Sequence, residues 1–244
     1  GGQSTPRHGV EISRIHSAVL DALEVVGLSQ APPSGIEIMT AAGAILGDDG
    51  RLRFPRALVE DMVDKAAKSF PLYGRDPAHH LDLSGDRVHY GTAGAVEGRY
   101  SFASRSTTFT AAPDLYDAAR LAHHLDNIHF FQRTMVCCEI EDLVEMDLNT
   151  LYACLSGTTK HVGSSFSDPS AVDPCMELIH MVAGGEEAWR AMPFVSLSNC
   201  FVVPPMKFAT ESCLPMEACI RAGMPILLLS AGQAGIERVE IHLH

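Results

Sequence analysis

The sequence is poor in positive charge and in long apolar runs. Its 244 residues contain 18 Lys and Arg against 30 Asp and Glu, which gives a formal net charge of -12. The basic residues are scattered, and we expect no nucleic acid partner because binding to a phosphate backbone rests on clustered cations. No apolar stretch reaches the roughly 18 residues of a membrane span, and the beginning of the chain lacks the apolar core of a signal peptide. We therefore expect a cytoplasmic protein without a membrane partner.

Spacings typical of metal and nucleotide sites are also missing. The seven cysteines form no C-x-x-C pair, and their odd number suits reduced thiols. The adjacent pairs His79/His80 and His123/His124 point their rings apart on a helix or a strand, so neither pair suits a shared metal ion. We predict no metal in the chain. No G-x-G-x-x-G sequence opens a helix, which removes the usual phosphate-binding signature of an open doubly wound sheet.

Helical periodicity marks the first part of the chain. Apolar residues in 10–27 recur at three- and four-residue steps, and Gly27 stands where a helix commonly ends. A second helix is predicted over 54–70, with Pro55 at its first turn. We expect residues 1–75 to form an N-terminal helical segment, or cap. Residues 76–112, rich in Gly, Ser and Thr, are expected to form a connector with short strands.

A strand-helix repeat occupies most of the remaining chain. Short apolar runs begin at residues 130, 161, 194 and 226, and their starts lie 31, 33 and 32 residues apart. Segments with a helical period alternate with these runs, at 113–128, 146–157, 173–189 and 208–223. This alternation implies parallel strands, which occur in closed eight-stranded barrels and in open doubly wound sheets.

The ends of the four apolar runs favour the barrel. Each run ends in different polar residues, and a ring of strand ends with different chemistry is typical of barrel enzymes. These residues are Arg133 and Thr134, Ser164 and Ser165, Ser198 and Asn199, and Ser230 and Gln233. Because a full barrel takes roughly 250 residues, we expect residues 113–235 to form about half of a TIM-type (β/α)8 barrel. Residues 88–96 could add one more strand.

The expected half-barrel leaves an open parallel edge. Residues 236–244, IERVEIHLH, are too short to supply the helix that should cover the last strand. An unpaired edge strand is prone to association. We therefore expect either a truncated chain or a partner that completes the barrel, and a homo-oligomer formed through the open edge is one such outcome.

Several stretches resemble one known family. They are LYGRDPAHHLDLSGDRVHYGTAGA, LDNIHFFQRT, CLSGTTKHVGSSF, VAGGEEAWRAMPFVSLSNCFVVPPMKFA and GMPILLLSAGQAG. Together they resemble the trimethylamine methyltransferase family, which includes a branch acting on glycine betaine and related quaternary amines. The resemblance runs from about residue 10 to residue 235, which leaves 236–244 as a tail outside the family pattern.

The resemblance implies both a fold and an activity. It implies an eight-stranded barrel that moves a methyl group from a methylamine to the cobalt of a corrinoid, and the corrinoid is carried by a separate small protein. Chains of the family are about twice as long as this one, and the pyrrolysine of the trimethylamine branch lies in the half that has no counterpart here. The implied partners are a corrinoid protein and a small methylated amine.

Methyl transfer from a quaternary ammonium requires few catalytic groups from the protein. The departing amine is neutral, so no general acid is required, and we name no catalytic residue. Position at the strand ends makes Arg133 and His161 candidate anion partners and Phe166 and Phe201 candidate cation-facing rings. The candidate hydrogen-bonding groups at the mouth of the corrinoid or substrate site are Ser164, Ser165, Asn199, Ser230 and Gln233.

Plainer interpretations stay open for these residues. A phenylalanine in a strand packs in the core more often than it faces a cation, and His161 would lie at the bottom of the barrel if its strand runs inward from that residue. Two functions are therefore expected from the sequence. The first is a corrinoid-dependent methyltransferase, and the alternative is a truncated, inactive family member that binds or assembles through its open barrel edge.

Overall fold

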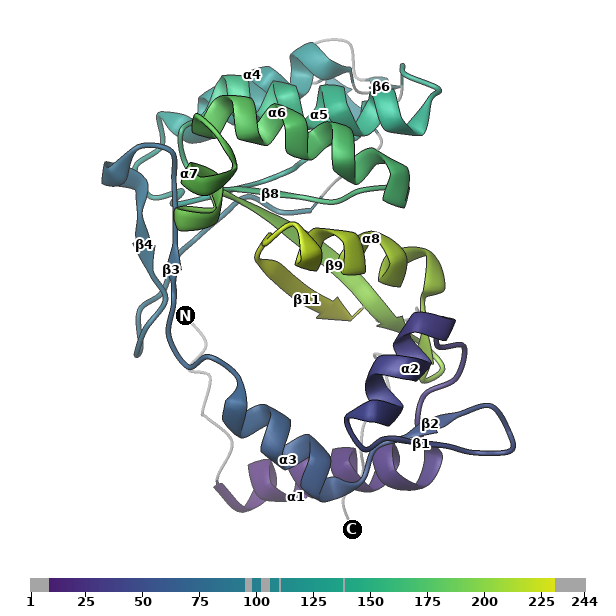
Figure 1. The fold of residues 1–244 in the computed structure, drawn as a ribbon. Helices are drawn as coiled ribbons and strands as arrows, with labels where there is room; N and C mark the ends of the chain where they lie inside the picture. Colours follow the sequence, from purple (N-terminus) through teal and green to yellow (C-terminus); the bar gives the residue numbers. More distant parts are fainter. Residues whose placement is uncertain (1–8, 95–97, 102–105, 110, 138, 231–244) are drawn as a thin grey trace. The chain divides into compact units, whose positions relative to one another are not determined.

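The computed structural model describes residues 9–94, 98–101, 106–109, 111–137 and 139–230 (Figure 1). Its chain divides into two units, each with its own buried apolar core. The first unit contains Gly1–Ala67, Phe201–Cys213 and Ser230–His244, and the second contains Lys68–Cys200 and Leu214–Leu229. No helix among the described residues is long and apolar enough to cross a membrane.

The first unit is built mainly from short helices. Their bounds are Gly9–Asp21 for α1, Ala22–Val26 for the following π-helix, Pro33–Ala41 for α2 and Arg56–Lys65 for α3. Both helices predicted for this segment are therefore confirmed. The first ends at Gly27, whose positive φ of 69° is a backbone conformation that glycine adopts without steric cost. The second begins directly after Pro55. Helix α2 was not predicted from the sequence.

Two small hairpins complete the first unit. Strands β1 (Ile45–Leu46) and β2 (Leu52–Arg53) pair antiparallel, and β10 (Lys207–Phe208) pairs antiparallel with the last residues of β9 (Val195–Val203). Ser29 joins the second hairpin to the N-terminal helices, because its N–H donates to Met206 O at 3.1 Å and its carbonyl accepts from Phe208 N at 2.8 Å. Residues 201–213 therefore pack with the N-terminal helices, although the sequence analysis assigned them to the barrel segment.

The second unit alternates helices with strands of one sheet. Its strands in that sheet are β7 (Phe131–Gln132), β8 (Val162–Ser164), the first part of β9, and β11 (Ile226–Ser230). Its helices are α4 (Ala112–His123), α5 (Leu143–Gly157), α6 (Val172–Ala183), α7 (Glu186–Ala191) and most of α8 (Thr210–Arg221). Short 3-10 turns lie at Pro77–His79 and Pro169–Ala171. The short strands β3 (Pro71–Leu72), β4 (Leu81–Asp82), β5 (Gly98–Ser101) and β6 (Ser106–Phe109) form two antiparallel pairs.

The sheet has the parallel order that the repeat predicts. Strand β8 pairs parallel with β7 and with β9, and β11 also pairs with β9, so the strands follow one another in chain order. All four predicted strands are present, and the α/β class is confirmed. Residues 88–96 contribute only a single parallel bridge, from Gly91 to Phe130. The sheet does not close within the described part of the chain.

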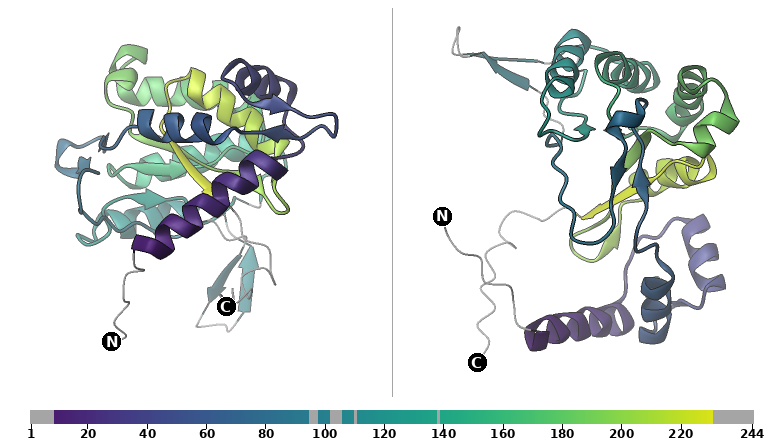
Figure 2. Two further views of the ribbon diagram at one scale, coloured as in Figure 1. Left: turned by 90° about the horizontal axis from the view of Figure 1, so that it is seen from below. Right: turned by 90° about the vertical axis from the view of Figure 1, so that its left-hand side faces the viewer.

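Helices cover one face of this sheet. Figures 1 and 2 show α4, α5 and α6 side by side along it. Phe131, Val162 and Val195 point from the strands into the buried core that these helices share. Successive residues of a strand point to opposite faces, so Gln132, Gly163 and Ser196 lie on the other face, which we call the inner face. A sheet in chain order with helices on one face agrees with part of a barrel, and the closed barrel stays a prediction.

Gly157 allows α4 and α5 to approach each other closely. A Cβ atom at this position would lie 2.5 Å from Ala119 Cβ and 2.8 Å from Tyr116 O. We expect Gly157→Ala to lower the free energy of unfolding by about 1–3 kcal/mol, since the two helices must move apart. Gly94, where an added Cβ meets nothing within 4 Å, is the matched control. Urea unfolding should leave Gly94→Ala unchanged, and equal stability of both variants would contradict the close packing.

Candidate functional site

Polar side chains gather at the carboxyl ends of β7 and β8. Arg133 follows β7 directly, and its guanidinium donates from Nη2 to Ser165 Oγ at 2.5 Å. Its backbone N–H donates to Gly163 O at 2.8 Å, which continues the ladder between the two strands. The half-buried Arg133 therefore holds a positive charge at the edge where barrel proteins place their chemistry.

A buried carboxylate lies within reach of this charge. Asp147 in the second turn of α5 is 2% exposed and accepts hydrogen bonds from Ser167 N at 2.6 Å and Ser167 Oγ at 3.2 Å. Burial raises the pKa of Asp147, and the bond from Ser167 and the charge of Arg133 oppose that rise. Asp147 was not predicted from the sequence. Its one signal was that it is the single charged residue of the helical segment predicted over 146–157, and a buried charge is uncommon without a partner.

Other strand-end residues supply uncharged hydrogen-bonding groups. Ser198 Oγ donates to Gln132 Oε1 at 3.0 Å across the inner face. Ser164 is buried, and its Oγ has no hydrogen-bond partner in the structure as described; the same holds for Thr134 Oγ1. Asn199 is also buried. These positions offer donors and acceptors without net charge.

His161 lies at the opposite, amino end of β8. Its side chain is 1% exposed, its Nδ1 is 2.8 Å from Tyr73 O and its Nε2 is 2.9 Å from Ser196 Oγ. A carbonyl oxygen can only accept, so Nδ1 carries the proton and Nε2 accepts from Ser196. Burial lowers the pKa of His161 to about 4. The imidazole is therefore neutral at pH 7, and an anion could meet it only as a hydrogen-bonding group.

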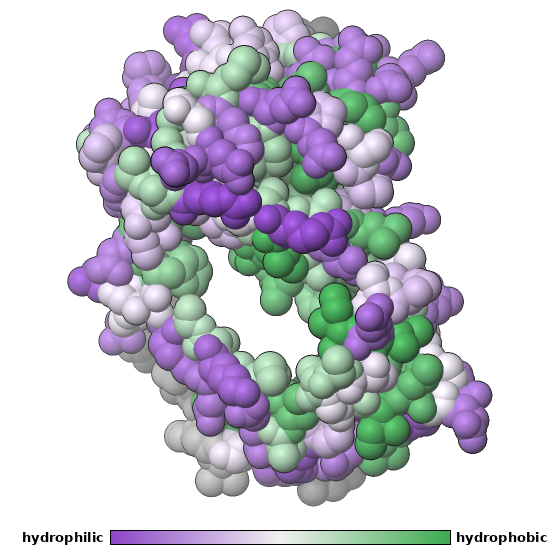
Figure 3. Space-filling view, in the orientation of Figure 1, coloured by the Kyte–Doolittle hydropathy of each residue, from purple (hydrophilic) through white to green (hydrophobic). Residues whose placement is uncertain are grey.

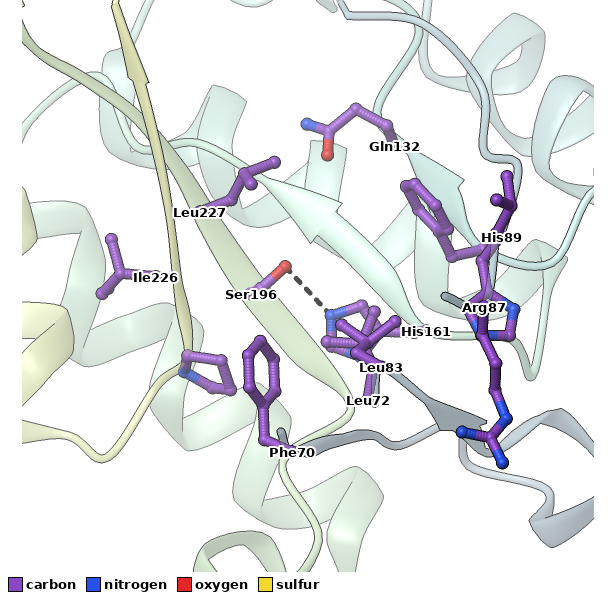
Figure 4. Close-up of a pocket in the computed structure, with 13 residues that line it drawn as sticks. Phe70, Leu72, Leu83, Arg87, His89, Gln132, His161, Ser196, Ile226 and Leu227 are labelled. Atoms are coloured by element: carbon purple, nitrogen blue, oxygen red, sulfur yellow. Dashed lines mark hydrogen bonds between the residues drawn. The ribbon is translucent and has the colours of Figure 1, made fainter. Parts of the chain in front are cut away.

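A cavity of about 410 Å³ opens on the inner face beside this histidine (Figure 4). Gln132, His161 and Ser196 form its polar part, while Arg87 and His89 approach from the segment after β4. The remaining walls are apolar, and come from Phe70, Leu72, Leu83, Val88, Phe130, Pro225, Ile226 and Leu227. Cavities of this size and polarity are typical of small-molecule sites.

The other predicted site residues lie elsewhere. Phe166 packs in the core of the second unit, and Phe201 belongs to the first unit. Phe201 lines an apolar cavity of about 630 Å³ there, with Phe208 at 6.5 Å between ring centroids. The side chain of Ser230 and all of Gln233 lie outside the described residues. The roles predicted for these four residues stay predictions.

Histidines also cluster near the amino end of β8, without the geometry of a metal site. The rings of His79 and His123 meet edge to face at 5.3 Å, and those of His123 and His124 at 5.2 Å. Within the ranges that the structure describes, no group of three or more His, Cys, Asp or Glu side chains is arranged to hold a metal ion.

The buried neutral state of His161 predicts a pH-dependent stability. Its pKa is about 4 when folded and 6.5 ordinarily, so below pH 6.5 the unfolded chain gains a proton that folded His161 does not take. The stabilisation is thus complete above pH 6.5 and is lost as pH falls towards 4, by about 3 kcal/mol. Arg87 and His89 share its cavity, and His123, whose pKa burial also lowers, acts in the same direction.

Comparison of the wild type with His161→Gln isolates the contribution of His161 to the pH dependence of stability. Gln can keep both hydrogen bonds without titrating, so the wild type should lose about 2 kcal/mol more than His161→Gln between pH 7.5 and pH 4.5. Guanidinium unfolding at the two pH values measures this difference, and contributions from other groups cancel. An equal loss in both proteins would show that His161 is not buried in its neutral form.

The sheet is parallel between β7, β8 and β9, helices cover one of its faces and polar residues lie at its carboxyl ends, which together define a β/α protein. A model of the family described as trimethylamine methyltransferase (MTTB) matches residues 6–237. The chain belongs to this family.

Several curated relatives share this family. The chain is 26% identical to the trimethylamine methyltransferase MttB of Desulfitobacterium hafniense over 229 residues, which cover 92% of this chain and 45% of the relative. It is 25% identical to MttB1 of Methanosarcina mazei over 231 residues, covering 92% and 46%. The MttB protein of Methanosarcina thermophila is 23% identical, with 92% and 47% covered. The chain thus spans about half the length of the curated relatives it matches.

Proposed function

We propose that this chain takes part in moving a methyl group from a quaternary or tertiary methylamine to a corrinoid held by a partner protein. The observation that carries the proposal is the family match, which covers residues 6–237. The relatives named above are trimethylamine methyltransferases. The polar carboxyl ends of β7, β8 and β9 are where we expect the reacting groups to meet.

The strand ends suit a large ligand that is rich in amides. When bound, the corrinoid supplies a strongly nucleophilic cobalt that accepts the methyl group. Its rim of amide groups needs neutral donors and acceptors, and Ser165 and Ser198 are side chains of this kind. The hydroxyl group of Thr134 supports the same assignment, because a buried polar atom without a partner is uncommon.

Arg133 favours a substrate that carries its own carboxylate. Its guanidinium is held at the strand ends by Ser165, and a planar guanidinium can bind a carboxylate through two parallel hydrogen bonds. We therefore favour glycine betaine over trimethylamine as the methyl donor. When the bond from nitrogen to the methyl carbon breaks, the amine departs neutral and needs no proton. The strand ends then have to orient the donor and exclude water.

The proposal predicts methylcobalamin formation by the purified chain. The chain is mixed with cob(I)alamin and either glycine betaine or trimethylamine, and absorbance reports the methylated product. We expect amine-dependent methylcobalamin, formed faster with glycine betaine, and none with heat-unfolded protein. A rate equal to that of the protein-free mixture with both amines would contradict the proposal for this chain.

Strand β11, which pairs with β9 among the described residues, favours a second role in assembly. Leu227, Leu228 and Leu229 are 46%, 58% and 39% exposed, so apolar side chains reach solvent from both faces of the strand. Hydrophobic side chains also surface over α2 of the first unit (Figure 3). We propose that copies of the chain associate through β11. Light scattering should then show a mass that rises with concentration and falls in Leu228→Lys, whereas a monomer at every concentration would contradict this role.

A further inference from the structure

Three residues form a row across the inner face of the sheet. Gln132 in β7 lies opposite Gly163 in β8, which lies opposite Ser196 in β9. Neighbouring strands are about 4.8 Å apart, so the two outer residues of the row are separated by about 10 Å at their Cα atoms. Because the middle residue is glycine, the side-chain amide of Gln132 can lie over it, on the side towards Ser196. A Cβ atom on Gly163 would lie 1.9 Å from Gln132 Oε1.

The serine of this row is paired with an oriented histidine. Ser196 Oγ donates to His161 Nε2 at 2.9 Å, because Tyr73 O accepts the proton of Nδ1 at 2.8 Å. A hydroxyl, an imidazole that accepts its proton and a third group that fixes the imidazole are the parts of an activated serine nucleophile. Here the third group is a backbone carbonyl, and the dashed line in Figure 4 marks the bond between serine and histidine.

The glutamine of the row supplies hydrogen-bond donors. Gln132 Oε1 accepts from Ser198 Oγ at 3.0 Å, which directs the amide and leaves its two N–H groups to donate. Gln132, His161 and Ser196 all line the 410 Å³ cavity, whose other walls are mostly aliphatic and aromatic. A small apolar molecule with one carbonyl group matches this lining, because its carbonyl oxygen can meet the amide while its chain contacts the walls.

We infer that Ser196 and His161 form a second reactive site, distinct from the strand ends, that accepts the acyl group of short apolar esters. Ser196 Oγ bonds to the ester carbonyl carbon and its proton passes to His161 Nε2. The bond from that carbon to the alcohol oxygen then breaks, and the alcohol leaves with the proton. A water molecule repeats the sequence, which releases the acid and restores the serine. No oxidant, reductant or metal is needed.

Burial keeps the His161 imidazole unprotonated at neutral pH, so it is free to accept a proton, but burial also makes it a weak base. The low pKa of its imidazole keeps it unprotonated at pH 7, and a weaker base transfers protons more slowly. Slow turnover is therefore expected, and covalent labelling is a more sensitive readout than hydrolysis. The reaction proposed at Ser196 does not involve the corrinoid, so its test is independent of the proposed methyltransferase function.

The test uses a fluorophosphonate probe on the whole chain. The serine oxygen displaces fluoride from phosphorus, so the chain gains the mass of the phosphonyl group, and peptide mapping locates it. We expect one label, on Ser196, and slow release of p-nitrophenol from p-nitrophenyl butyrate. Ser196→Ala should lower both rates at least 10-fold, while Ser170→Ala, which alters an exposed serine bonded to Asp168, should keep both.

Two results would overturn the inference. One is a wild-type chain that takes up no label at millimolar probe, and the other is a label that persists on Ser196→Ala at the same rate. Thermal unfolding of Ser196→Ala checks that its fold is intact. His161→Gln provides the second variant: it can keep both hydrogen bonds but cannot take the serine proton as imidazole does, so labelling of Ser196 must fall in a protein that still folds.

Discussion

Replacing Arg133 by methionine is expected to lower kcat/KM for glycine betaine about 100-fold. A charge-assisted hydrogen-bond pair to a carboxylate stabilises by about 3 kcal/mol, and each 1.4 kcal/mol changes a rate tenfold. Trimethylamine has no carboxylate, so its kcat/KM should change less than about threefold. Methylcobalamin formation at varied amine concentration measures both values.

The two substrates distinguish binding from structural damage. Arg190→Met is the matched control, since Arg190 forms an exposed pair with Glu186 on α7, away from the strand ends. It should leave both rates unchanged. An equal fall for glycine betaine and trimethylamine in Arg133→Met would mean that Arg133 supports the fold through Ser165 and Asp147, and an unchanged betaine rate would exclude it as the carboxylate partner.

Lys160→Met is expected to cause the largest loss of stability, about 3 kcal/mol. The side chain is 4% exposed, and its ammonium donates three hydrogen bonds, to Ala122 O at 2.7 Å, Leu125 O at 2.9 Å and Ile128 O at 2.6 Å. All three ammonium donors are therefore used at the carboxyl end of α4 and in the loop to β7. Methionine fills the space but leaves these carbonyl groups without a donor.

The matched control is a basic residue on the surface of the same unit. Arg221 is 72% exposed and lies 4.0 Å from Glu217 in α8. Arg221→Met should change the free energy of unfolding by less than about 0.5 kcal/mol, because an exposed arginine in a 4.0 Å ion pair contributes little to stability. Urea unfolding compares both variants with the wild type. A loss in Lys160→Met as small as that in the control would show that water satisfies the three carbonyl groups.

Sequence periodicity was enough to locate the sheet but not all of the first unit. The strand starts at 131, 162, 195 and 226 lie within one residue of those predicted, because buried parallel strands are continuous apolar runs between helices. Helix α2 was missed because its nine residues, PSGIEIMTA, are too few for a clear helical period. The packing of residues 201–213 with the N-terminal helices rests on hydrogen bonds to Ser29, which no local pattern reveals.

The candidate site was only partly accessible from sequence. Arg133, Ser164 and Ser165 could be proposed because they lie at the ends of predicted strands, and the hydrogen bond from Arg133 to Ser165 joins two of them. Asp147 and Gln132 could not be found in this way. Asp147 meets Ser167 across 20 residues of sequence, and Gln132 meets Ser198 across 66. Contacts of this kind depend on how helices and strands pack, which single-residue patterns do not specify.

His161 shows how the direction of a strand decides the role of a residue. It precedes β8, so a parallel strand places it at the amino end, where Tyr73 and Ser196 bury it. Arg133 follows β7 and therefore reaches the carboxyl end. The two candidate anion partners thus lie at opposite ends of the same sheet, and only Arg133 stands at the end where methyl transfer is proposed.

Isotope transfer tests the central claim most directly. The purified chain is incubated with cob(I)alamin and glycine betaine that carries deuterated methyl groups, and mass spectrometry follows both products. Our account predicts methylcobalamin with three deuterium atoms and one molecule of dimethylglycine for each one formed. Cobalamin that remains unmethylated, or dimethylglycine that does not accumulate in equal amount, would contradict it.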